Sequence, residues 1–198
     1  MSTPQDRQSP LPSRSAGFTI VEMTMVIAIS AILIAVALTV GAETLKYTAY
    51  AQDDFSVQHE ANRAYNRITE VLRKTGWSTD ATETYPRVID GGAALELRLL
   101  DDLDGNGWPF SGTSGDLEWG SEIYTIRREA DGTVAIFDNT DTVVWTCGRL
   151  IESISFETVI QEPSLHFQEV RITILATRTT ADGVPLSFTA AGSVHMRN

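Results

Sequence analysis

One uninterrupted apolar segment constrains this chain more than any other feature of its sequence. Residues 18–41 hold a single charged side chain, Glu22, and no proline. At about 1.5 Å per residue, a helix of this length spans roughly 36 Å, against about 30 Å for the hydrocarbon core of a bilayer. A buried core helix seldom stays apolar on all sides over such a length, and a cleaved secretory signal has a shorter apolar region. We therefore expect a membrane-spanning helix over residues 18–41.

The charge distribution indicates the orientation of this helix. Arg7 and Arg14 precede it, whereas only Lys46 follows closely behind it. Because basic residues flank the cytoplasmic end of a membrane helix, we expect a single-pass membrane protein with a cytoplasmic N-terminus and its acidic part on the other side of the membrane. Residues 77–198 carry eight basic and nineteen acidic side chains in a chain of net charge −11. This balance argues against a nucleic-acid binder and against a soluble cytoplasmic enzyme.

The segment before the helix and the position of Glu22 are equally informative. Residues 1–16 are polar, contain three prolines and resemble a disordered leader. The leader ends at Gly17, and the apolar run begins with Phe18. Glu22 lies within that run, where an acid costs about 2.5–3.5 kcal/mol at mid-helix and less near the interface. Two interpretations follow: a carboxylate that reaches the membrane edge, or one that pairs with a cation in apolar surroundings.

Residues 17–22, Gly-Phe-Thr-Ile-Val-Glu, followed by an apolar helix resemble the N-terminal signal of type IV prepilins and type II secretion pseudopilins. The resemblance implies that a prepilin peptidase cuts between Gly17 and Phe18 and methylates the new amine of Phe18. It also implies that Glu22 neutralises the terminal amine of an adjacent subunit during filament assembly.

Two departures from the major pilins imply a minor subunit. Many major pilins have a proline in this helix and a C-terminal disulfide, whereas this chain has no proline between residues 13 and 85 and one cysteine, Cys147. The sequences SISF at 153–156 and EVRITI at 169–174 look most like J-type minor pseudopilins and W-type minor pilins.

The resemblance implies a structural, non-enzymatic subunit of a type II secretion or type IV pilus filament. Its implied partners are other pilin or pseudopilin subunits, the prepilin peptidase, the inner-membrane assembly platform and the membrane, but no nucleic acid. The alternative is a single-pass, membrane-anchored binding domain that does not polymerise.

Periodicity predicts an α+β fold in which one long N-terminal helix packs on a C-terminal antiparallel sheet. We divide the chain into a leader (1–17), a membrane helix (18–41), an amphipathic continuation (42–76) and a β-rich head (77–198). The polar triplet at 52–54 indicates either a bend or the point where the helix leaves the membrane bundle. Gly76 is a plausible helix cap. The apolar face of the continuation comprises Leu45, Tyr50, Val57, Ala61, Ala64, Ile68, Val71 and Leu72.

Alternating apolar residues and turn signals predict the strands of the head. Asp131-Gly132 and Ala181-Asp182-Gly183 each indicate a hairpin between two strands. The expected strands are 93–100, 122–129, 133–137, 142–146, 150–160, 169–179 and 184–197.

One loop has the pattern of a calcium ligand set. Asp102, Asp104 and Asn106, followed by Gly107, fit the first half of an EF-hand loop, D-x-D-x-N-G. The twelfth position of such a loop is Thr113 rather than glutamate, so Asp101, Asp116 or Glu118 would have to supply the missing ligand. The other interpretation is a tight turn, since the same residue types favour turns.

The sequence contains no recognisable catalytic motif. The three histidines, His59, His166 and His195, lie in unlike contexts, and Cys147 follows an apolar strand as a packed thiol would. We expect the four tryptophans to serve packing: Trp77, Trp108, Trp119 and Trp145. Two of them, Trp108 and Trp119, flank the acidic loop and could instead face a partner.

Overall fold

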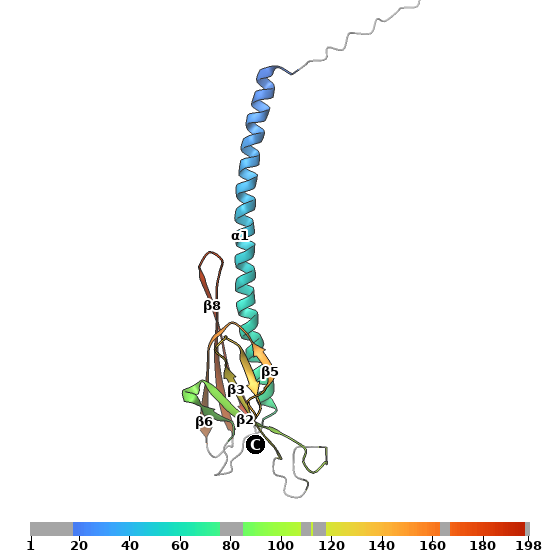
Figure 1. The fold of residues 1–198 in the computed structure, drawn as a ribbon, viewed down its shortest axis with the longest axis vertical. Coiled ribbons are helices and arrows are strands. Elements are labelled where there is room, and N and C mark those ends of the chain that lie inside the picture. The colour runs from blue at the N-terminus through green and yellow to red at the C-terminus, as the bar shows by residue number, and fades with distance from the viewer. Residues whose placement is uncertain (1–17, 76–84, 108–111, 113–117, 163–166, 197–198) are drawn as a thin grey trace, which may run out of the picture. The chain divides into compact units, whose positions relative to one another are not determined.

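The computed structural model describes residues 18–75, 85–107, 112, 118–162 and 167–196. It contains one long helix, α1 (Ile20–Arg73), and eight strands in two antiparallel sheets, which confirms the predicted α+β class (Figure 1). The chain forms two compact units, residues 1–48 and residues 49–198. The apolar part of α1 belongs to the first unit, and its C-terminal part belongs to the second together with all the strands.

Helix α1 continues without interruption through the polar triplet at 52–54, so the triplet marks no break in the helix. Two of these residues make contacts within the second unit: Asp53 pairs with Arg178 at 3.1 Å, and Asp54 accepts a hydrogen bond from Gln58. The helix ends at Arg73, and the predicted cap Gly76 lies outside the described residues.

The buried face of α1 covers the C-terminal part of the predicted apolar pattern. It begins at Val57 and ends at Leu72, whereas Leu45 and Tyr50, which continue the same apolar pattern, are exposed. Leu45 belongs to the first unit, and Tyr50 precedes the part of α1 that contributes to the core. The predicted packing of the helix on the strands is confirmed for this C-terminal part.

The strands divide between two sheets instead of the one expected. Residues 87–148 form a five-stranded meander in the order β1-β2-β3-β4-β5, and residues 151–196 form a three-stranded meander in the order β6-β7-β8. The strand bounds are β1 (Arg87–Ile89), β2 (Ala94–Leu100), β3 (Trp119–Arg128), β4 (Val134–Phe137), β5 (Val143–Gly148), β6 (Ile151–Glu162), β7 (Phe167–Thr179) and β8 (Pro185–Met196), with a short 3-10 helix, η1 (Asp90–Gly92), after β1. All predicted strands are present, and only β1 was not predicted.

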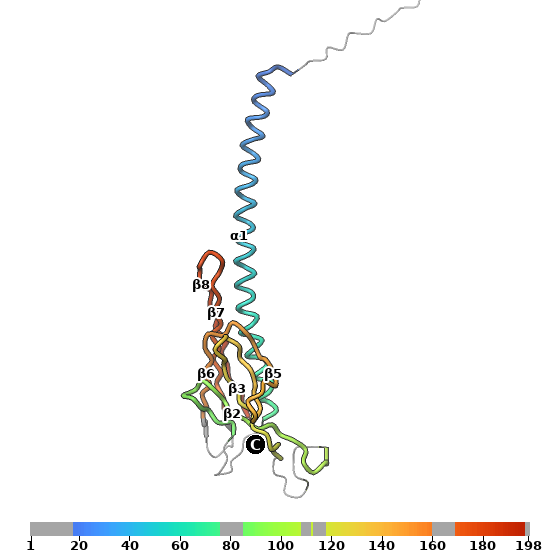
Figure 2. Tube along the Cα trace, in the orientation of Figure 1, coloured from blue at the N-terminus to red at the C-terminus, as the bar shows by residue number. Residues whose placement is uncertain are grey.

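Both predicted hairpins are confirmed. Gly132, between β3 and β4, has φ +82°, and Gly183, between β7 and β8, has φ +79°, which is the left-handed region that favours glycine. Figure 2 shows β7 and β8 as one long hairpin, and their register runs from Gln168 opposite Met196 to Thr179 opposite Pro185.

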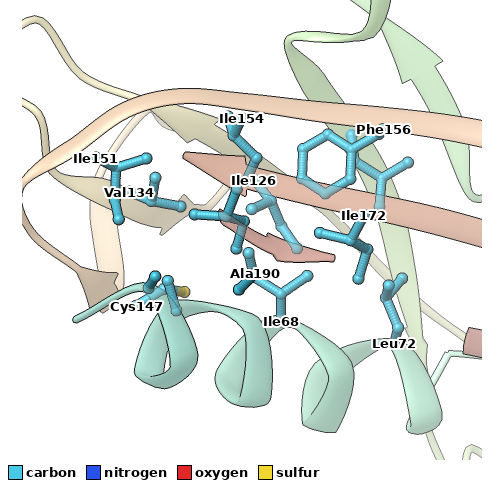
Figure 3. Close-up of a cluster of buried hydrophobic side chains, with 14 of the residues drawn as sticks. Ile68, Leu72, Ile126, Val134, Cys147, Ile151, Ile154, Phe156, Ile172 and Ala190 are labelled. Carbon is cyan, nitrogen blue, oxygen red and sulfur yellow. The ribbon is translucent and has the colours of Figure 1, made fainter. Parts of the chain in front are cut away.

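One apolar core holds the second unit together. Ile68 and Leu72 of α1 point toward Ile126 of the larger sheet and Ile172 of the smaller one (Figure 3). The two sheets meet where β6 begins, since the Ile151 carbonyl accepts a hydrogen bond from the Arg128 guanidinium at 2.6 Å. Helix α1 therefore packs against residues from both sheets.

Candidate functional site

The N-terminal end of α1 is closed by reciprocal hydrogen bonds between Thr19 and Glu22. The Thr19 hydroxyl accepts from the Glu22 backbone N–H at 3.2 Å, and the Glu22 carboxylate accepts from the Thr19 backbone N–H at 3.0 Å. This arrangement is a capping box, and such a cap is typically worth about 1 kcal/mol. The T-x-x-E spacing at 19–22 signalled it in the sequence, where Glu22 was considered only for its charge. Glu22 therefore has a local structural role as well.

The apolar part of α1 is exposed on every side. All residues from 18 to 52 are exposed, with Phe18 at 75% and Ile20 at 84%. Within the described part of the chain, α1 is the one helix long and apolar enough to cross a membrane. Because exposed apolar surface costs roughly 25 cal/mol per Å² in water, this segment needs lipid or other protein surfaces around it.

The acidic loop at 101–107 brings three carboxylates together. Oxygens of Asp102, Asp104 and Glu118 all lie within 4.8 Å of one another. Backbone N–H groups hold them there: Asn106 donates to both aspartates at 3.0 Å, and Leu103 donates to Glu118 at 2.6 Å. A hydrogen bond from the Gly112 backbone N–H is the main cause that lowers the pKa of Asp104, so this carboxylate is ionised at neutral pH.

The spacing of the three carboxylates allows them to contact one calcium ion together. Calcium binds oxygens at about 2.3–2.6 Å, so two oxygens on the same ion lie at most about 5 Å apart. The three carboxylates satisfy that limit without moving. Calcium binding itself stays a prediction.

The structure selects among the ligands considered for the loop. Glu118 lies with the two aspartates, whereas Asp101 accepts a hydrogen bond from the Asp102 backbone N–H and is not part of the cluster. The amide nitrogen of Asn106 donates to Asp104 at 3.0 Å. Thr113 and Asp116 lie outside the described residues.

Comparison with known proteins bears on the N-terminal segment. Residues 12–38 match the family model described as the prokaryotic N-terminal methylation motif. The chain carries this methylation motif. The motif is characteristic of type IV pilins and pseudopilins, so the resemblance is confirmed at that level. No curated protein and no solved structure matches the chain significantly.

The methylation motif extends from the leader into α1. Its predicted cleavage residue, Gly17, lies outside the described residues, whereas Phe18 lies two residues before the start of the helix and is exposed. Glu22 lies in the first turn of α1, four residues after Phe18 in the sequence. The motif and an apolar helix together are typical of membrane-anchored pilins and pseudopilins. The cleavage position, the methylation of Phe18 and the pairing of Glu22 stay predictions.

Cys147 and the three histidines lie outside the segment that matches the methylation motif. Cys147 is fully buried, as predicted, and burial raises the pKa of its thiol to about 11, which disfavours the reactive thiolate. His59 stacks on Phe55 with 6.1 Å between ring centroids, and His195 lies on β8 opposite Glu169. His166, Trp77 and Trp108 lie outside the described residues.

Proposed function

We propose that this chain is a structural minor pilin or pseudopilin, cut by a prepilin peptidase between Gly17 and Phe18 and assembled through α1 into a type II secretion or type IV pilus filament. The observation that carries the proposal is the methylation motif at residues 12–38, which leads directly into an apolar helix exposed on all sides. Such a helix requires lipid before assembly and neighbouring helices after it.

In this proposal, the subunit resides in the inner membrane before assembly, with its N-terminus in the cytoplasm and residues 49–198 on the other side of the membrane. Its partners are the prepilin peptidase, the assembly platform and other pilin-type subunits. Among these subunits, the order of the strands after residue 150 favours a J-type or W-type minor role, because β6 and β7 carry the SISF and EVRITI sequences. The protein has a structural rather than an enzymatic role in this proposal.

Glu22 supplies the specificity of assembly in this account. A filament grows by head-to-tail contacts, so each helix meets its neighbours at a fixed stagger. Apolar side chains of neighbouring helices can pack at many different staggers. The Glu22 carboxylate, in contrast, is paired only in the alignment that brings the terminal amine of a neighbouring subunit next to it. Leaving one partner of a buried ion pair alone typically costs about 3–5 kcal/mol. That cost exceeds the capping contribution of about 1 kcal/mol, so the charge dominates.

The capping box allows the charge of Glu22 to be tested separately from its structural role. Glu22→Gln removes the charge but keeps a side chain that serves in a capping box, whereas Thr19→Ala keeps the charge and removes the cap. Each variant is expressed with its sibling subunits, and co-purification of the processed protein with those subunits is measured. We expect Glu22→Gln to lose co-assembly and Thr19→Ala to retain most of it. Both should still be cleaved, because the cut bond precedes Phe18.

Two outcomes would contradict this account. Normal complex formation by Glu22→Gln would reject the charge as the device that sets the stagger. Failure of Thr19→Ala to the same degree as Glu22→Gln would show that the helix cap, and not the charge, is what assembly requires.

We propose in addition that Asp102, Asp104 and Glu118 bind calcium. The support is the closeness of their oxygens, within 4.8 Å, in a loop where Gly105 and Gly107 have φ values of +70° and +87°. A calcium ion bound there would offset two of the three negative charges of the clustered carboxylates.

A further inference from the structure

A groove of about 680 Å³ lies between the exposed side of α1 and the strand β5, within residues 49–198. Figure 1 shows β5 beside the C-terminal part of the helix. Sites of this volume accommodate small molecules or short peptide segments. The groove is lined by Asn62, Arg63, Asn66 and Arg67 of α1 and by Trp145 and Thr146 of β5, among others.

β5 is an edge strand with apolar side chains at the surface. Among the described strands it pairs only with β4, and Val143, Val144 and Trp145 are 50%, 38% and 37% exposed. Proteins protect such edges with charged residues, proline, bulges or a covering helix. The β5 sequence, VVWTCG, contains neither charge nor proline, but its register with β4 shifts on both sides of Trp145 and Thr146, and its end at Gly148 lies against Ala64 of α1. No described strand pairs with the other side of the stretch at Trp145 and Thr146.

Trp145 is held in place beside the groove. Its ring stacks on Tyr124 with 6.3 Å between centroids, and the Arg67 guanidinium lies 5.6 Å from its ring centre. Arg67 is fixed in turn by Glu70 at 2.7 Å. We had expected Trp145 to serve packing, yet over a third of it is exposed. A partly exposed tryptophan that packs on a tyrosine and lies beside an arginine has the composition of a binding hot spot.

The charge of the groove differs from that of the chain as a whole. Arg63 is 57% exposed, and its nearest carboxylate among the described residues is Glu60, at 3.8 Å. Glu60 is also engaged by the Arg149 backbone N–H at 2.8 Å. The groove thus presents a weakly paired cation in a chain of net charge −11. Electrostatic complementarity favours a partner with negative charge here.

We propose that this groove binds an extended acidic segment of another protein, which pairs with the edge of β5, covers Trp145 and places a carboxylate against Arg63. Strand addition of this kind takes affinity from main-chain hydrogen bonds and specificity from the alternate side chains. The proposal does not depend on filament assembly, since it rests on residues of the second unit alone.

The test uses the full-length protein in detergent micelles and a short fluorescein-labelled peptide of alternating valine and glutamate, with fluorescence anisotropy as the readout. A peptide with lysine in place of glutamate tests the charge, and one N-methylated on alternate amides tests strand pairing. We expect each change to weaken binding about tenfold or more, which corresponds to the loss of one charge-assisted contact or of the main-chain bonds. These comparisons need no variant of the protein.

Variants then locate the site. Trp145→Ala should weaken the glutamate peptide about tenfold or more, since a hot-spot side chain is lost. Arg63→Gln should remove most of the preference for glutamate over lysine, whereas Arg73→Gln, an exposed arginine of α1 that is not among the groove residues, should leave it unchanged.

The proposal would be overturned if the glutamate peptide failed to bind at millimolar concentration, bound no better than the lysine peptide, or tolerated N-methylation. Unchanged affinity of Trp145→Ala would overturn the location. The full chain could also self-associate through this groove. If Trp145→Ala abolishes that self-association and the peptide does not compete with it, the occupant is a second copy of this chain and not an acidic segment of another protein.

Discussion

Gly148→Ala tests the contact between β5 and α1 directly. A Cβ atom at position 148 would lie 2.8 Å from the Cβ of Ala64 and 2.9 Å from the carbonyl oxygen of Glu60. Carbon atoms in contact are normally about 3.5–4.0 Å apart, so the strand or the helix has to move by up to about 1 Å. Overpacking of a core costs typically about 1–3 kcal/mol. We expect the upper half of that range, because one of the two atoms belongs to the backbone and cannot rotate away.

The measurement is urea unfolding of the full-length protein in detergent micelles, followed by tryptophan fluorescence and circular dichroism. Gly148→Ala should lower the midpoint, while Gly41→Ala, where a Cβ meets nothing within 4 Å, should not lower it, because alanine is the better helix former. Ala64→Gly should partly rescue Gly148→Ala, with a coupling free energy of about 1 kcal/mol in the double-mutant cycle. If Gly148→Ala is as stable as the wild type, β5 does not lie against α1 as described.

Two further predictions concern the thiol and the acidic loop. Burial raises the pKa of the Cys147 thiol from 9.0 to about 11, so above pH 9 the unfolded chain loses this proton before the folded chain does. The free energy of unfolding should therefore fall between about pH 9 and 11. In urea titrations at several pH values, Cys147→Ala should lack this part of the pH dependence. Calcium should raise the melting temperature of the full chain progressively with the logarithm of the calcium concentration. Glu118→Gln should abolish this shift, whereas Asp101→Asn should retain it. Identical melting temperatures in calcium and in chelator would favour a simple turn.

The features predicted from sequence are those that local patterns determine. The apolar run at 18–41 and the glycines at 132 and 183 led to the long helix and both hairpins, because helix length and turn type depend on neighbouring residues. The cap at Thr19 was equally local but was overlooked. β1 escaped notice because three residues are too few to show alternation.

The remaining features depend on which distant residues meet. Alternation shows that a strand has a buried face but not which sheet it joins, so the division between β5 and β6 could not be predicted. Glu118 was one of three candidates for the acidic loop, and it is distinguished by contacts distant in sequence: its carboxylate lies with those of Asp102 and Asp104 and accepts a hydrogen bond from the Leu103 backbone N–H, 15 residues away. The groove brings Arg63 close to Trp145, which no pattern in either segment indicates.

The intact mass of the mature chain tests the central claim most directly. Protein extracted from the membranes of cells that contain a prepilin peptidase should lack residues 1–17, begin at Phe18 and carry one additional methyl group. Gly17→Leu should insert into the membrane and keep the leader, because a bulky side chain replaces the unhindered backbone at the cut bond. Wild-type protein that retains Met1 in the presence of an active prepilin peptidase would contradict the assignment as a processed pilin-type subunit.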